Sequence, residues 1–136
     1  MNLKILEIAS YTENNKVLEN FTHKSKNKNP LCGDVMEISL ILENNIIKDI
    51  GYQCKSCIYC QASVSLLSRS VIKEPLEKIT HLLKKIELFF NDDFNFLEEI
   101  KLKNTKSLKE IMSNDNISRK ECLLLPFKTL SKALNL

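Results

Sequence analysis

Closely spaced cysteines in the first half of the chain suit metal or sulfur chemistry. Cys54, Cys57 and Cys60 place three thiols within seven residues. A thiolate at a helix N-terminus is stabilised by the positive end of the helix dipole, which makes it available as a ligand or nucleophile.

The spacing permits a C-x2-C-x2-C ferredoxin-type cluster site, but the fourth cysteine and its proline are missing. A thioredoxin-like pair of Cys57 and Cys60 lacks the flanking strand-helix-strand order. Cys54 and Cys60 are also explained simply as small buried apolar side chains.

Two further cysteines stand beside charged residues. In the hexapeptide Asn29–Asp34, Gly33 separates Cys32 from Asp34 and permits a tight turn that would direct the thiol and the carboxylate to one centre. An ordinary glycine turn is the alternative interpretation. Cys122 lies one helical turn after Arg119, whose charge would balance a thiolate. The alternatives here are a core cysteine next to three leucines and a surface arginine.

The composition predicts one globular domain over residues 1–136, since 43% of the residues are hydrophobic and 27% are charged. A net charge of +3 argues against a nucleic-acid partner. No stretch approaches the roughly 18 apolar residues of a membrane span, so no membrane association is expected. The first residues, MNLKILEIAS, lack the apolar run of a signal peptide and predict a cytoplasmic protein. In that reducing compartment, clustered cysteines favour metal or sulfur chemistry over structural disulfides.

Alternating polarity predicts an antiparallel sheet in the first half of the chain. From Val35 apolar and polar residues alternate, the two asparagines at 44 and 45 predict a tight turn, and a second strand follows at about Ile46 to Gln53. Residues 21–26 form a weaker candidate for a third strand. The basic stretch His23–Lys28 is interpreted as a solvated strand edge, with the steering of an acidic partner as the alternative.

The second half of the chain has a helical pattern. Cys57, Cys60, Val64, Leu67 and Val71 follow one helical stripe. Further helices are expected from Pro75 through Ile86, over 92–103 and over 107–112, followed by a break at 114–116. The last helix should start near Ile117 or Pro126 and end at Leu134. Strands first and helices second predict an α+β fold, a small antiparallel three-stranded sheet with helices packed on one face.

The combination of these motifs resembles the U-type iron–sulfur cluster assembly scaffold proteins, the family of IscU, SufU and the NifU N-terminal domain. The resemblance rests on N-P-x-C-G-D at 29–34, the strand hairpin, Cys57 followed by Ala62-Ser63, and R-x-x-C-x-x-L from Arg119. Cys57 and Cys122 are 65 positions apart, and this longer gap is similar to the SufU branch.

The resemblance implies a function in iron–sulfur cluster assembly, as a scaffold and sulfur acceptor and not as an enzyme. It implies a metal site of Cys32, Asp34, Cys57 and Cys122 that holds Zn2+ or a transient iron–sulfur cluster. Cys122 would accept persulfide sulfur from a cysteine desulfurase, with Cys57 as the second candidate, and Arg119 would be auxiliary. A downstream iron–sulfur carrier or apo-protein would receive the product.

Three positions depart from the family pattern and predict a divergent member. Ser56 replaces a usual glycine, Cys60 replaces a small residue and adds an auxiliary thiol, and Pro126 replaces a small helical residue. Two other functions stay open at this point. One is a small zinc-stabilised interaction domain with a closed site. The other is a ferredoxin-like electron carrier that uses Cys54, Cys57 and Cys60.

Overall fold

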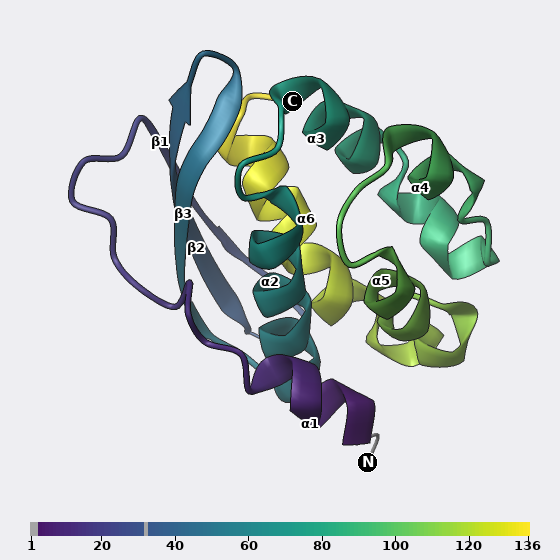
Figure 1. Cartoon of the computed structure of the whole chain (residues 1–136). Helices are drawn as coiled ribbons and strands as arrows, with labels where there is room; N and C mark the ends of the chain where they lie inside the picture. The colour runs from purple at the N-terminus through teal and green to yellow at the C-terminus, as the bar shows by residue number, and fades with distance from the viewer. Residues whose placement is uncertain (1–2, 32) are drawn as a thin grey trace.

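A three-stranded antiparallel sheet is covered on one face by helices (Figure 1). The computed structural model describes residues 3–31 and 33–136. The elements follow in the order α1 (Leu3–Ala9), β1 (His23–Lys28), β2 (Val35–Glu43), β3 (Ile46–Lys55), α2 (Ile58–Val71), α3 (Leu76–Lys84), the 3-10 helix η1 (Ile86–Asn91), α4 (Asn95–Ile100), α5 (Thr105–Ile111), the 3-10 helix η2 (Asn114–Arg119) and α6 (Lys120–Ala133). This arrangement confirms the predicted α+β fold.

The sheet has the strand order β1-β2-β3, with β2 in the centre. Asn44 and Asn45 connect β2 to β3 with φ angles of 53° and 60°. Asparagine tolerates this left-handed region, and two such residues in succession form the tight turn whose twist suits a hairpin. The predicted hairpin is therefore confirmed. The bounds of the two outer strands differ slightly from the prediction. The strand β3 continues to Lys55 and not only to Gln53, and β1, the weaker candidate, begins at His23 and not at position 21.

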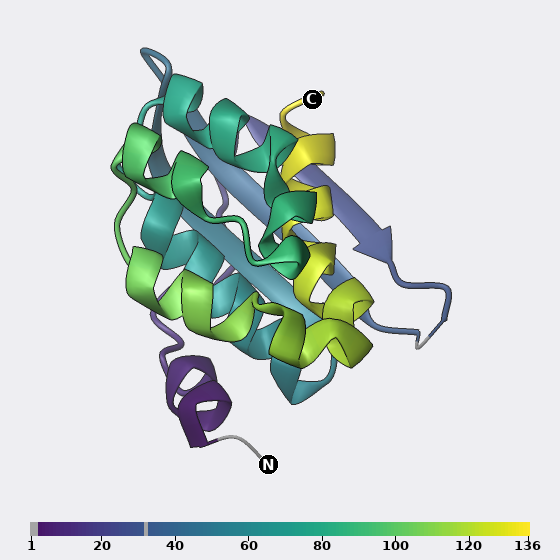
Figure 2. The same ribbon diagram turned by 90° about the vertical axis from the view of Figure 1, so that its right-hand side faces the viewer.

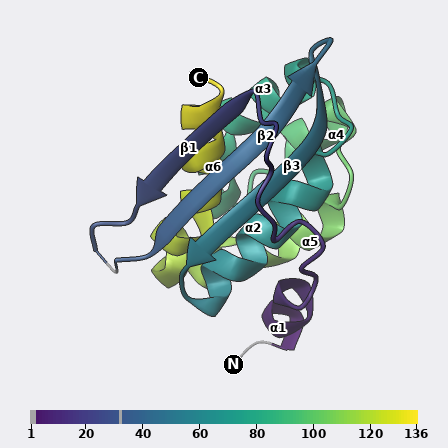
Figure 3. The same ribbon diagram turned by 90° about the vertical axis from the view of Figure 1, so that its left-hand side faces the viewer.

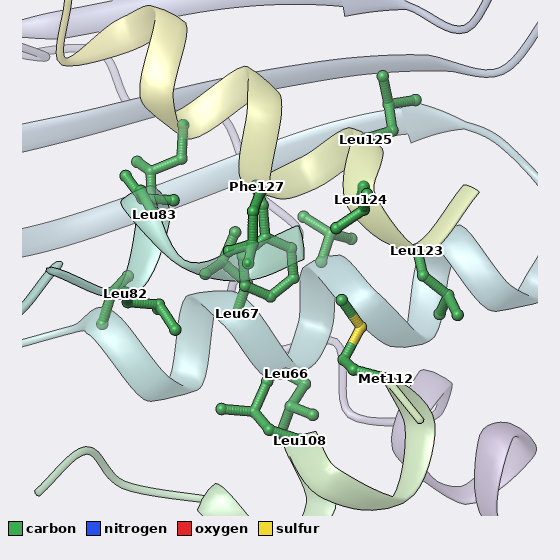
Figure 4. Packing of buried hydrophobic residues seen from close by; sticks show 14 of the residues in the cluster. Leu66, Leu67, Leu82, Leu83, Leu108, Met112, Leu123, Leu124, Leu125 and Phe127 are labelled. Carbon is green, nitrogen blue, oxygen red and sulfur yellow. The ribbon is translucent and has the colours of Figure 1, made fainter. Parts of the chain in front are cut away.

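Helices α2 and α6 pack on the sheet face that carries the apolar side chains. Every second residue of β2 points to this face, and the side chains of Met36, Ile38 and Leu40 are fully buried there. Leu66 and Leu67 of α2 pack against the apolar residues of α6, which include Phe127 (Figure 4). The outer helices α3 and α5 cover the core on the side away from the sheet (Figure 2). This packing fixes the start of α2 and the start of α6 relative to the sheet.

The segment between α1 and β1 crosses the opposite face of the sheet (Figure 3). The Tyr52 backbone N–H donates to the Asn14 carbonyl at 3.0 Å, and the Lys16 ammonium pairs with Asp49 at 3.0 Å. Gly51 lies directly beneath this segment. A Cβ atom at position 51 would stand 2.6 Å from the Lys16 carbonyl oxygen. Glycine is therefore required here by close approach of two backbone segments.

A Gly51→Ala substitution should destabilise the fold by about 3 kcal/mol, at the upper end of the cost of overpacking, because the obstructing atom is backbone. Urea unfolding followed by circular dichroism measures this change. Gly33→Ala is the matched control, since its added methyl group meets no atom within 4 Å and would cost only about 1 kcal/mol through its φ of +75°. Equal midpoints for wild type and Gly51→Ala would contradict this close packing.

Two of the helices after α2 are shorter than the sequence pattern predicts, whereas α5 (Thr105–Ile111) begins two residues before the predicted 107–112. The helix expected through Ile86 ends at Lys84, and the one expected over 92–103 is reduced to α4. Asp92 ends the 3-10 helix η1 and Lys101 ends α4, each with a left-handed φ, of 53° and 52° respectively. The expected break at 114–116 lies between α5 and α6 in the 3-10 segment η2, where the backbone of Asn116 departs from helical angles. No helix in the described part of the chain is long and apolar enough to cross a membrane.

Both predicted starts of the last helix are wrong. The helix α6 begins at Lys120, and Pro126 lies inside it. An interior proline removes one helical hydrogen bond and typically costs about 3 kcal/mol. The apolar residues on either side of Pro126, from Leu123 to Phe127, are almost fully buried. Burial of such side chains contributes roughly 1.5–3 kcal/mol each and outweighs the local cost.

Candidate metal centre

Three elements bring Asp34, Cys57 and Cys122 to one point. Asp34 precedes β2, Cys57 is the N-cap residue of α2, and Cys122 lies in the first turn of α6. One carboxylate oxygen and the two Sγ atoms all lie within 4.8 Å of one another. The structure thus groups three of the four predicted ligands. The fourth, Cys32, lies outside the described residues, and its role as a ligand stays a prediction.

A hydrogen-bonded loop places Asp34 at this point. The Asn29 side chain accepts a hydrogen bond from the Leu31 N–H at 3.0 Å, and its carbonyl accepts one from the Gly33 N–H at 2.8 Å. The Asn29 N–H in turn donates to the Asp34 carbonyl at 2.8 Å. Gly33 has a φ of +75°, so the tight turn predicted around this glycine is present. Asn29 is buried and holds the loop closed from within.

The N-terminus of α2 faces the carboxylate. Asp34 Oδ2 accepts a hydrogen bond from the Cys57 backbone N–H at 3.4 Å. The first N–H groups of a helix have no partner within the helix, and together with the helix dipole they favour negative charge. The fold therefore places the acidic groups of the site where a helix of 14 residues stabilises them.

Buried hydroxyl groups hold α6 beside α2. The Ser63 hydroxyl of α2 donates to the Leu123 carbonyl at 2.6 Å, one residue beyond Cys122. The Ser25 hydroxyl of β1 donates to the Thr129 carbonyl at 2.6 Å. The buried bond from Ser63 is costly to break, and the partly buried bond from Ser25 ties α6 to β1 as well. The Ala62-Ser63 motif did not by itself predict this hydrogen bond, although a serine on the buried face of a helix is a usable signal for one.

The donor set fits a metal that prefers sulfur. Zinc is bound by thiolates, imidazoles and carboxylates, usually by four of them in a tetrahedron. Two thiolates and one carboxylate within 4.8 Å match three corners of such a site. The carboxylate oxygen is the harder donor and the one more easily displaced. Cys57 is partly exposed, whereas Cys122 and Asp34 are 7% and 8% exposed, so the group lies at the edge of the core.

Arg119 lies near the start of α2. Its guanidinium stacks over the Tyr59 ring at 5.1 Å from the ring centroid, and Tyr59 is two residues after Cys57. A stacked arginine keeps its charge while its side chain is held in one orientation. The stack thus places a positive charge beside the N-terminus of α2. No sequence pattern indicates the contact with Tyr59, because the two residues are 60 positions apart.

The two other cysteines are not part of the group. Cys60 is fully buried on the apolar stripe of α2, and burial raises the pKa of its thiol far above the usual value. Cys54 is partly buried at the end of β3, and burial raises the pKa of its thiol as well. Both shifts disfavour the thiolate form that binds metals. Among the described residues the structure thus does not assemble the C-x2-C-x2-C site of a ferredoxin.

Replacing Asp34 with alanine should weaken zinc binding about tenfold or more, because it removes one donor and the acceptor for the Cys57 N–H. Competition with a chromophoric chelator measures the affinity. Cys54→Ala is the control and should bind zinc like the wild type, since Cys54 lies outside the group. The reverse pattern, with Cys54→Ala impaired and Asp34→Ala intact, would support the ferredoxin alternative.

Comparisons with known proteins match the chain to one domain family. The family described as the NifU-like N-terminal domain matches residues 2–133. A protein of Thermotoga maritima, described as the iron–sulfur cluster assembly scaffold protein IscU, is 32% identical over 130 residues, which are 96% of this chain and 89% of that protein.

Solved structures share the fold at lower sequence identity. A scaffold protein described for the SUF system of Fervidobacterium islandicum AW-1 superposes with a TM-score of 0.81 at 23% identity, covering 98% of this chain and 96% of that one. A NifU-like N-terminal protein of Brucella abortus gives 0.79 at 20% identity, covering 98% and 91%. The matched family, the relative and the fold lead to one conclusion: the chain belongs to the NifU-like N-terminal domain family.

Proposed function

We propose that this protein is an iron–sulfur cluster assembly scaffold that accepts sulfur at the centre formed by Asp34, Cys57 and Cys122, with Cys32 as the fourth ligand. The observation that carries the proposal is the grouping of two thiols and one carboxylate within 4.8 Å. The name of the Thermotoga maritima relative supports the same function. The long interval between Cys57 and Cys122 supports a place in the SufU branch.

A metal at this centre is held by this chain's own residues. The three thiolates and the carboxylate would bind one zinc ion, which keeps the sulfurs deprotonated and protected until a partner arrives. Their four negative charges exceed the charge of the ion by two, and Arg119 on Tyr59 offsets part of this excess. Because the carboxylate is the weakest donor, Asp34 is the side chain that yields its place most easily when cargo enters or leaves.

Sulfur transfer is proposed to occur at Cys122. Its thiolate attacks the terminal sulfur of a persulfide on a cysteine desulfurase and forms a new sulfur–sulfur bond. The bond between the two sulfurs of the donor breaks, and the donor cysteine leaves with the electron pair as a thiolate. No net oxidation occurs, because one persulfide is exchanged for another. Cys122 is only 7% exposed, and the partly exposed Cys57 lies beside it at the edge of the core.

The proposed partners follow from the two ends of this process. A cysteine desulfurase supplies the sulfur, and a downstream iron–sulfur carrier or apo-protein removes the assembled cluster, which is the cargo of the site. We further propose that residues 1–136 act as one domain and that the protein operates in the cytoplasm. A zinc-stabilised interaction domain would need a closed metal site. This alternative is disfavoured, because Cys57 is partly exposed and Leu31, which precedes the predicted ligand Cys32 in the chain, is 83% exposed.

Anaerobic incubation with a cysteine desulfurase, cysteine and ferrous iron tests the proposal. We expect the protein to acquire iron and acid-labile sulfide in equal amounts, together with the visible absorption of a cluster. The same mixture without the desulfurase should give no cluster. A protein that acquires neither acid-labile sulfide nor a protein-bound persulfide would contradict the proposed function.

A further inference from the structure

Six exposed lysines surround the edge strand β1 beside the candidate metal centre. Three of them, Lys24, Lys26 and Lys28, occupy alternate positions of β1. The Lys132 ammonium of α6 reaches the same strand and donates to the Lys26 carbonyl at 2.9 Å. These side chains are named together the basic edge, which consists of Lys24, Lys26, Lys28, Lys55, Lys128 and Lys132.

The strand register gathers the central lysines on the open face of the sheet. Lys28 pairs with Val35, and Val35 pairs with Lys55 on the other side. Lys26 lies two residues from Lys28 and therefore points to the same face. Three lysines thus surround Val35, which directly follows the predicted ligand Asp34. Lys55 is likewise only two residues from Cys57.

Two hollows flank β1 at this end of the sheet. On the open face a hollow of about 430 Å³ is lined by Lys26 and Lys55, with Gln53, Asn15 and Glu37 on its walls. A smaller hollow of about 220 Å³ lies on the other side of the strand. Its lining includes Lys28, Lys128, Glu121 and the loop residue Pro30. A ligand in the smaller hollow would lie against the loop that precedes Asp34, and a ligand in the larger hollow would lie against Val35, the residue after Asp34.

Most of the positive charge on the basic edge is not neutralised. Glu37 pairs with Lys24 at 3.4 Å, and Glu121 pairs with Lys128 at 3.3 Å. The other four lysines make no ion pair with any residue that the structure describes. These four ammonium groups stand together on β1 and on the neighbouring ends of β3 and α6, so this surface is locally positive although the whole chain has a net charge of only +3. Such a concentration attracts and orients an acidic partner.

We propose that the basic edge docks an acidic peptide segment of the protein that exchanges sulfur or cluster with the metal centre. This inference rests on the proposed function and names the chemistry of the partner. An extended segment suits the surface, because the hollows lie on either side of one strand. A nucleic acid is disfavoured by the small net charge and by Glu37 and Glu121, which lie within the hollows.

Titration of the isotope-labelled full chain with a hexaglutamate peptide, followed by NMR, tests the proposal. We expect shifts of the backbone signals of Lys26, Lys28, Gln53 and Lys55, which weaken when the ionic strength rises from about 0.05 to 0.5 M. The double variant Lys26→Gln/Lys55→Gln should bind the peptide about fivefold more weakly. The control Lys84→Gln/Lys106→Gln removes the same charge from α3 and α5 and should bind like the wild type.

Three outcomes would overturn the proposal: no shifts, shifts spread evenly over all exposed lysines, or equal loss of affinity in the two double variants. Parallel titrations with inorganic phosphate and with a short oligonucleotide identify other anions, and tighter binding of either would also overturn it. The peptide assay needs neither metal nor desulfurase. If the peptide does not bind but the protein assembles a cluster, only the docking surface is rejected. If the peptide binds but no cluster is assembled, only the proposed function is rejected.

Discussion

Replacing Cys122 with alanine should abolish the transfer of sulfur from a cysteine desulfurase to this chain while the fold survives. The substitution removes the attacking thiolate and leaves the hydrogen bond between Ser63 and Leu123 in place. The loss of one sulfur atom from this buried position should cost about 1 kcal/mol of stability, which is typical of a single substitution. Mass spectrometry of the chain after anaerobic incubation measures the added sulfur, and desulfurase turnover measures the stimulation.

The matched control is Cys54→Ala, which removes a thiol outside the group. This variant should accept sulfur at the wild-type level, because burial raises the pKa of the Cys54 thiol and disfavours its thiolate. Full stimulation by Cys122→Ala would reject Cys122 as the acceptor. Persulfide found on Cys57 in the wild type would move that role to the second candidate.

Replacing Cys57 with serine should lower the affinity for zinc by at least about 100-fold. Cys57 contributes one of the two described sulfur donors, and its position at the N-terminus of α2 places it next to Asp34. A hydroxyl group remains protonated at neutral pH and is a poor substitute for a thiolate ligand. Chelator competition measures the affinity, and circular dichroism shows whether the fold is retained.

The control for this prediction is Cys54→Ser, which changes the same atom three residues away. It should retain zinc like the wild type, because Cys54 does not share the site. Wild-type zinc affinity in Cys57→Ser would contradict a metal centre at this position. Loss of zinc in both variants would instead point to an effect on the strand and helix that carry them.

The sheet and the start of α2 were predictable because strong local signals specify them. Period-two alternation after Val35, two asparagines in the turn and a helical stripe after Cys57 each act within a few residues. The convergence of Cys57 and Cys122 required the family resemblance, since no local pattern connects residues 65 positions apart. The same long separation explains why the stacking of Arg119 on Tyr59 was missed.

The helical half was less predictable, because tertiary packing there overrides local propensity. Left-handed residues such as Asp92 and Lys101 end helices whose apolar pattern continues. Pro126 is tolerated within α6 because the helix is buried on both sides of it. The requirement for Gly51 was also hidden, since it depends on a segment 35 positions away in the chain.

The most direct test of the metal centre is the content of metal and acid-labile sulfide per chain after anaerobic purification. We predict about one zinc ion per chain without sulfide, or iron with a matching amount of sulfide if the site carries its cargo when isolated. Either metal should fall to background in Cys57→Ser. A wild-type protein that is folded, fully reduced and free of both metals would contradict the proposed centre.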